Sequence, residues 1–246
     1  MLLTKSMAIP VGDGTMPAYL ARPEGSQTRP AIIVLQEVFG VNAEMKRITE
    51  LVASAGYVGL APNYYHRTDP DLDAPYDQQG IERGRAAASH VTRATLAEDL
   101  RAAAAWLRGQ PYVNGHVGTW GFCYGGTVAF FSATLPEIDA ACSFYGGAIA
   151  KPLASGEPEM LAEVDKVRAQ LFLAFGALDE SIPAENVERI RGTLTAKQKA
   201  FELHVYPNVG HAFFRQGVGA EATPAAREAW RLVQAFFKQT LGLVAS

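Results

Sequence analysis

The stretch Gly121-Phe122-Cys123-Tyr124-Gly125-Gly126 decides the fold. It joins a predicted strand, His116–Trp120, to a helix predicted over Thr127–Thr134. A sharp strand-to-helix turn of this kind, a nucleophile elbow, needs small residues two before and two after the nucleophile, because larger side chains would collide with neighbouring backbone. The first glycine of the stretch and Gly125 meet that need. The turn therefore predicts Cys123 as a nucleophile exposed at the end of a strand.

Strands and helices alternate from residue 31 onward. Unbroken apolar runs predict strands buried on both faces, and apolar residues at helical spacing predict the helices between them. Before them, Gly12-Asp13-Gly14 predicts a hairpin turn between Met1–Pro10 and Met16–Pro23. This order predicts a single domain, residues 1–246, with the α/β-hydrolase fold: a mostly parallel central sheet, helices on both faces and an N-terminal antiparallel hairpin. The predicted strands are Ala31–Leu35, Tyr57–Ala61, His116–Trp120, Ile138–Tyr145, Ala169–Phe175 and Ala200–Tyr206, and helices are predicted over 43–55, from about 77, and over 95–108, 127–134, 184–195 and 223–241.

The composition is typical of a compact protein in water. Hydrophobic residues make up 48% of the 246 residues and the net charge is −3, so no basic surface indicates a nucleic-acid or membrane partner. No apolar run approaches the roughly 20 residues that span a bilayer. The first residues lack the apolar segment of a signal peptide, and two cysteines make no disulfide framework, so we expect a cytoplasmic protein. It should be a monomer or a small homo-oligomer, between which the sequence does not decide.

The two cysteines lie in different contexts. The helix after Cys123 directs its positive N-terminal end at the sulfur, which favours a thiolate. A glycine-rich turn can also hold a buried, inert cysteine, but the flanking strand and helix favour the nucleophile. Cys142 lies inside a predicted strand with no such turn, and we interpret it as a small core residue.

A thiol nucleophile needs a general base, for which the chain offers five histidines. His211 follows the last predicted strand, at a carboxyl end where catalytic groups of parallel sheets lie. His66 also follows a strand, but it precedes the nucleophile in sequence, and we interpret it as a pocket-wall residue. The remaining candidates lie in a polar helix, in a turn and on an outward-facing strand position: His90, His116 and His204.

In this fold the triad runs in the order nucleophile, acid, base, so the acid should follow a strand between Cys123 and His211. Asp179 meets this condition, because it follows the apolar run Ala169–Phe175. Glu180 is the competitor, and an Asp beside a Glu can also serve only as a helix cap. The triad order favours Asp179.

An oxyanion hole needs two backbone N–H groups. Tyr124, directly after the nucleophile, should supply one, and Val38, in the loop after Ala31–Leu35, should supply the other. Glu37 precedes Val38 in that loop. A carboxylate there is either a solvated loop residue or a functional group.

Taken together, these motifs resemble the dienelactone hydrolases (carboxymethylenebutenolidases), and the resemblance covers essentially the whole chain. It is carried by Gln36-Glu37-Val38-Phe39-Gly40-Val41-Asn42, Gln110-Pro111-Tyr112 with Asn114-Gly115, the cysteine elbow, Asp179 before Pro183, and Gly210-His211-Ala212-Phe213 followed by Arg215. The cysteine elbow combined with the Gln-Glu loop is far more specific than an elbow alone. Members of that family cleave the lactone rings of dienelactones in chloroaromatic breakdown and need no metal or cofactor.

The resemblance implies the triad Cys123–His211–Asp179, with Glu37 as a switch acting on the thiol and Arg215 as a binder of the substrate carboxylate. We therefore expect a cofactor-free, cysteine-dependent hydrolase of carboxylic esters. Its substrate should be a small anionic lactone of the dienelactone type, cleaved through a thioester acyl-enzyme. A broad acyl-esterase or thioesterase is the alternative, and a non-catalytic binding protein on this fold is a second one.

The family's pocket also contains a second arginine and a tyrosine from a helical stretch. Here that stretch reads Gly80-Ile81-Glu82-Arg83-Gly84-Arg85, so the arginine is Arg83 or Arg85, and the nearest tyrosine is Tyr76. This departure from the family pattern leaves the identity of the substrate open.

Overall fold

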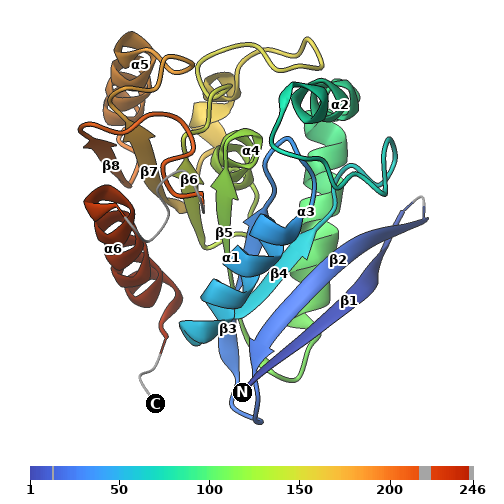
Figure 1. Ribbon diagram of the computed structural model, residues 1–246. Coiled ribbons are helices and arrows are strands. Elements are labelled where there is room, and N and C mark those ends of the chain that lie inside the picture. Colours follow the sequence, from blue (N-terminus) through green and yellow to red (C-terminus); the bar gives the residue numbers. More distant parts are fainter. Residues whose placement is uncertain (13, 216–222, 244–246) are drawn as a thin grey trace.

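In the computed structural model, which describes residues 1–12, 14–215 and 223–243, eight strands form one sheet (Figure 1). The strand order is β1-β2-β4-β3-β5-β6-β7-β8, with β2 antiparallel to both β1 and β4 and the other neighbours parallel. The predicted mostly parallel sheet with an N-terminal hairpin is confirmed. The strands are β1 (Leu2–Val11), β2 (Gly14–Pro23), β3 (Arg29–Leu35), β4 (Val58–Pro62), β5 (Val113–Phe122), β6 (Ala140–Phe144), β7 (Gln170–Gly176) and β8 (Phe201–Tyr206). The helices are α1 (Ala43–Ser54), α2 (Gln78–Ala88), α3 (Arg93–Arg108), α4 (Tyr124–Ser132), the 3-10 helix η1 (Met160–Lys166), α5 (Ala184–Ala196) and α6 (Pro224–Leu241).

Strand β5 illustrates how the sheet buries both of its faces. Successive side chains of a strand point to opposite faces. Trp120 points toward α6, where its ring stacks on Trp230 with 5.2 Å between centroids. Thr119 points the other way, and its hydroxyl lies 2.7 Å from that of Ser132 in α4. Helices α1 and α6 thus cover one face and α3 and α4 the other (Figure 1). Removing the Trp120 side chain would cost about 3–5 kcal/mol of unfolding free energy.

A capping residue, Asp77, sets the start of helix α2. The Asp77 carboxylate accepts a hydrogen bond from the backbone N–H of Gly80 at 2.8 Å, which satisfies a free donor at the start of α2. The helix therefore begins where the sequence predicts it. No described helix is both long enough and apolar enough to cross a membrane.

Several elements differ from the sequence-based expectation. Strand β5 spans Val113–Phe122, longer than the predicted His116–Trp120, and α4 begins at Tyr124, three residues before the predicted start. β6 ends at Phe144, because Tyr145 takes a positive φ of 42° and turns the chain away from the strand. Residues Met160–Lys166 form a 3-10 helix that was not predicted. A segment of about two turns is too short to give a clear hydrophobic period.

Candidate active site

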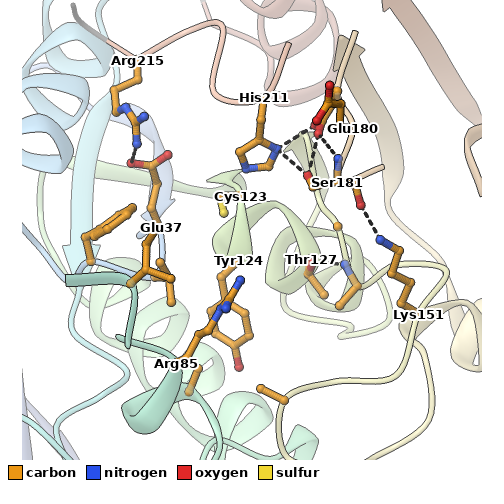
Figure 2. A pocket seen from close by; sticks show the side chains of 18 of the residues that line it. Glu37, Arg85, Cys123, Tyr124, Thr127, Lys151, Glu180, Ser181, His211 and Arg215 are labelled. Atoms are coloured by element: carbon orange, nitrogen blue, oxygen red, sulfur yellow. Dashed lines mark hydrogen bonds and ion pairs between the residues drawn. The ribbon is translucent and has the colours of Figure 1, made fainter. Parts of the chain in front are cut away.

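The turn after β5 holds Cys123 in a conformation that few residues other than glycine adopt, with φ 54° and ψ −114°. Such a conformation costs on the order of 1–3 kcal/mol and persists only where the surroundings enforce it. A Cβ on Gly121 would lie 1.8 Å from the carbonyl oxygen of Gly125, and one on Gly125 would lie 2.1 Å from that of Leu35. The elbow therefore requires both glycines, and it turns the Cys123 side chain toward the cavity at the start of α4 (Figure 2).

Asp179 and His211 come from two loops that the backbone holds together. The N–H of Leu178 donates to the carbonyl of Val209 at 2.9 Å, so the loops after β7 and β8 run side by side. His211 Nδ1 lies 2.7 Å from Asp179 Oδ2, and the Asp179 side chain is completely shielded from solvent. A buried carboxylate on Nδ1 orients the imidazole, so that Nε2 faces the reacting atoms.

The charges at this pair reinforce one another. Burial alone would raise the pKa of Asp179, but hydrogen bonds from His211 and Ser181 outweigh it and hold the pKa below its ordinary value. Burial alone would lower the pKa of His211, whereas hydrogen bonds to Asp179 and Cys123 and the charges of both raise it to about 10. The site therefore favours the imidazolium form of His211 beside the Asp179 carboxylate.

Ser181 is a part of the site that the sequence analysis did not single out. Its N–H and its hydroxyl both donate to Asp179 Oδ1, at 2.9 and 2.5 Å, and the hydroxyl lies 3.2 Å from His211 Nδ1. One oxygen of Asp179 thus binds Ser181 and the other binds His211. The bond from the Ser181 N–H to Asp179 Oδ1 forms an Asx-turn, and the sequence offers as its signal only an Asp followed two residues later by a Ser.

Glu37 and Arg215 face each other at the opposite side of the cavity (Figure 2). Glu37 is buried, and its Oε2 lies 3.6 Å from Arg215 Nη1. Arg215 also packs over the ring of Tyr76, with Cζ 4.1 Å from the centroid. Burial raises the pKa of Glu37 despite the opposing charge of Arg215 and a hydrogen bond from Tyr76. This carboxyl can therefore take up a proton more readily than an exposed one.

Close packing at Gly84 brings one of the two candidate arginines to the cavity. A Cβ on Gly84 would lie 2.1 Å from the Val38 carbonyl oxygen, so α2 rests directly on the loop after β3. Arg85 lines the same cavity as Cys123 and Tyr124 (Figure 2). Arg83 instead forms a two-point ion pair with Asp69, at 2.6 and 2.7 Å, and does not line the cavity. Substrate binding by Arg85 stays a prediction.

The cavity has a volume of about 760 Å³, well above the size of a small lactone and within the range of sites for larger ligands. Both expected oxyanion donors, Val38 and Tyr124, border it. Tyr124 is the first residue of α4, and an N–H at that position has no partner within its own helix. The apolar wall is formed by Val38, Phe39, Ile81, Ala88, Ala148, Pro152, Ala154 and Leu178.

The structure contradicts the prediction for His66 and agrees with that for Cys142. His66 does not line the cavity, so its interpretation as a pocket-wall residue is wrong. Its Nε2 lies 3.1 Å from Asp99 Oδ1, and Arg67 binds the same carboxylate at 2.9 Å, so the three side chains form one network. Cys142 is completely buried in β6, as expected of a core residue, and burial raises the pKa of its thiol well above the ordinary value.

The sequence profile of the dienelactone hydrolase family matches residues 16–241, nearly the whole chain. The chain belongs to the dienelactone hydrolase family. It is therefore a carboxylic-ester hydrolase that acts on a small-molecule ester or lactone. Among residues 1–12, 14–215 and 223–243, no cluster of three or more His, Cys, Asp or Glu side chains could hold a metal ion.

Individual members of the family are similar over their full length. A Synechocystis protein provisionally named a carboxymethylenebutenolidase is 35% identical over 239 residues, 97% of each chain. The carboxymethylenebutenolidase of Pseudomonas putida is 31% identical over 232 residues, 92% of this chain and 94% of its own. The crystal structure of a provisionally named dienelactone hydrolase from Klebsiella pneumoniae aligns with a TM-score of 0.85 at 28% identity, over 97% of this chain and 99% of that one. This family member thus has the α/β-hydrolase fold.

Proposed function

We propose that this family member hydrolyses anionic lactones and related esters through a thioester on Cys123. The observation that carries the proposal is the line of three groups at one cavity wall: a cysteine in a strained elbow, a histidine beside it, and a buried aspartate on the far nitrogen of that histidine. The same constellation performs nucleophilic catalysis on unrelated folds.

The proposed reaction has two halves. The Cys123 thiolate attacks the ester carbonyl carbon, and the resulting oxyanion accepts hydrogen bonds from the N–H groups of Tyr124 and Val38. The intermediate collapses to the thioester, and the leaving oxygen takes the proton from His211 Nε2. Water then gives a proton to the same nitrogen and attacks the thioester, which releases the acid and restores the thiolate–imidazolium pair.

In this proposal Glu37 protects the thiol at rest. A carboxylate close to a thiol disfavours a second negative charge there, so it limits oxidation and alkylation. A substrate carboxylate that binds Arg215 would release Glu37, which could then take the thiol proton. The burial of Glu37, its pairing with Arg215 and its raised pKa support such a role. The simpler alternative is that Glu37 only shapes the loop that carries the Val38 N–H.

A trapped acyl-enzyme tests the nucleophile. Mixing the hydrolase with an activated ester and quenching in acid should add the mass of one acyl group to the peptide that contains Cys123. Hydroxylamine should remove it, as it does from thioesters. An acyl group found only on a serine, or on Cys142, would overturn the proposal.

Turnover of Glu37→Gln tests the switch. We expect lower turnover from a variant with an unchanged circular dichroism spectrum, and iodoacetamide should modify wild-type Cys123 faster once a carboxylate analogue that leaves the thiol open occupies Arg215. If Glu37→Gln turns over normally and the resting thiol already reacts at the rate of a thiolate, the switch is wrong while the triad stands.

The substrate charge is tested with matched arginine variants. Arg215→Ala and Arg85→Ala should lower kcat/KM for an anionic lactone by about ten- to a hundredfold, because a charge-assisted contact is worth roughly 1.5–3 kcal/mol. Neutral esters should lose much less. Arg83→Ala is the control, because Arg83 is ion-paired to Asp69 outside the cavity. Equal losses on neutral and anionic substrates would favour the broad-esterase alternative.

A further inference from the structure

A third cation lines the cavity on the side away from Arg215. Lys151 lies in the loop after β6, and its ammonium group donates a hydrogen bond to the carbonyl oxygen of Ser181 (Figure 2). Within the described ranges of the chain, no carboxylate lies at ion-pair distance from it. An ammonium group has three N–H donors, so this one keeps donors for a ligand while it holds the carbonyl.

Most other charges on the cavity wall are matched. Glu37 pairs with Arg215, and Asp179 pairs with His211. Among the residues that the structure describes, Arg85 and Lys151 are the cavity-lining cations without a carboxylate partner, and Glu180 is the lining carboxylate without a cation. The wall therefore carries an excess of positive charge that Arg215 does not account for, and an anionic substrate would neutralise it.

The neighbours of Lys151 indicate which part of a substrate it meets. In the proposed reaction the leaving oxygen takes its proton from His211, so the leaving part lies on the His211 side of Cys123. The carbonyl of Ser181, which accepts the hydrogen bond from Lys151, belongs to the residue whose hydroxyl lies 3.2 Å from Nδ1 of His211, and Lys151 itself lines the cavity. Figure 2 shows Glu37 and Arg215 on the other side of the sulfur. Lys151 thus borders the part of the cavity on the other side of the sulfur from Arg215, where the part of a substrate that does not face Arg215 would lie.

We infer that Lys151 binds an anionic group on the part of the substrate that carries the leaving oxygen. The inference rests on the proposed function and narrows it: the preferred substrates are esters or lactones with one negative charge toward Arg215 and a second toward Lys151. A cavity of about 760 Å³ has room for such a doubly charged molecule. Lys151 is then a specificity-determining residue that touches substrate.

Three chromogenic esters separate the two charges. Para-nitrophenyl acetate is neutral, para-nitrophenyl hemisuccinate carries its charge on the acyl part, and the acetate of a carboxylated para-nitrophenol carries it on the leaving part. Lys151→Gln should lower kcat/KM for the third ester by about ten- to a hundredfold and for the other two by less than about threefold. High salt should reduce the preference of the wild type for the third ester.

Two matched variants control for charge and fold. Lys151→Arg keeps a cation and should retain most of the preference for the third ester. Lys166→Gln removes an exposed lysine that pairs with Glu163 outside the cavity, and it should leave all three rates unchanged.

An equal loss on all three esters would mean that Lys151 only anchors its loop to Ser181, and it would overturn the inference, as would no loss at all. Failure of the proposed function has a different signature: Cys123→Ala would continue to hydrolyse para-nitrophenyl acetate, whatever the Lys151 variants do.

Discussion

One cysteine of this hydrolase lies in β6 and the other directly follows the neighbouring strand β5, yet their environments are opposite. Cys142 pairs in register with Trp120, only three residues before Cys123. Cys142 stays in the regular part of β6 and is completely buried, whereas Cys123 lies one residue beyond β5, at positive φ, and lines the cavity. The comparison shows that position decides the role of a cysteine. Inside a strand it is a small core residue, whereas in the turn after a strand its thiol is presented to the cavity.

Replacing each cysteine by alanine should give the largest difference between the two positions, measured as the loss of kcat. Cys123→Ala should lower kcat by on the order of 10⁴–10⁶, the usual cost of losing the nucleophile of a triad. Cys142→Ala should leave kcat nearly unchanged and lower the unfolding free energy by about 1 kcal/mol, because it leaves a small cavity. Steady-state kinetics and urea unfolding measure both. More than a tenth of wild-type activity in Cys123→Ala would show that the cysteine is not the nucleophile.

Alkylation should sharpen the contrast without any mutation. In the folded protein iodoacetamide should modify Cys142 at least about 10³-fold more slowly than Cys123, since a buried thiol reacts only when the structure opens. Peptide mass spectrometry over a time course gives both rates. Comparable rates would mean that β6 opens far more often than its complete burial indicates.

The titration of His211 should respond to one cysteine only. In Cys123→Ala its pKa should fall from about 10 toward the ordinary value, because a hydrogen bond and a negative charge that raise it are both removed. Cys142→Ala should leave it unchanged. Since His211 must be protonated to serve the leaving oxygen, the alkaline loss of wild-type kcat/KM should also lie near that raised pKa. NMR titration of the imidazole signals with a carboxylate analogue bound, the state in which the proposed switch frees the thiolate, tests the shift, and equal pKa values in wild type and Cys123→Ala would then contradict a thiolate partner.

Ser181 should give the smallest effect. Ser181→Ala keeps the backbone N–H on Asp179 but removes the hydroxyl, and we expect a three- to tenfold lower kcat/KM, or roughly 1 kcal/mol. Ser181→Thr keeps a hydroxyl and should restore most of the rate. The alkylation rate of Cys123 should follow the same order, while Cys142 stays protected. If Ala and Thr behave alike, the hydroxyl has no part in holding Asp179.

The sequence predicted what depends on local chemistry. The elbow around Cys123 and the apolar strands before it follow from residue type and spacing, and the structure brings Asp179 and His211 together as the triad order requires. Their catalytic roles stay predictions. The choice between Arg83 and Arg85 needed a tertiary contact, the close approach of α2 to Val38. Ser181 needed the adjacency of two loops that lie 30 residues apart in sequence, and the wrong interpretation of His66 came from order along the chain, which says nothing of a partner such as Asp99.

The segment that carries both His211 and Arg215 is fixed by the two phenylalanines between them. Phe213 and Phe214 are buried, and their rings pack 5.8 Å from Phe144 and 5.3 Å from Trp120. The conformational entropy that is lost when His211 and Arg215 are fixed relative to each other is therefore lost on folding and not on binding. Because binding incurs no such loss for this segment, more of the interaction free energy with a substrate remains as affinity and as alignment for attack.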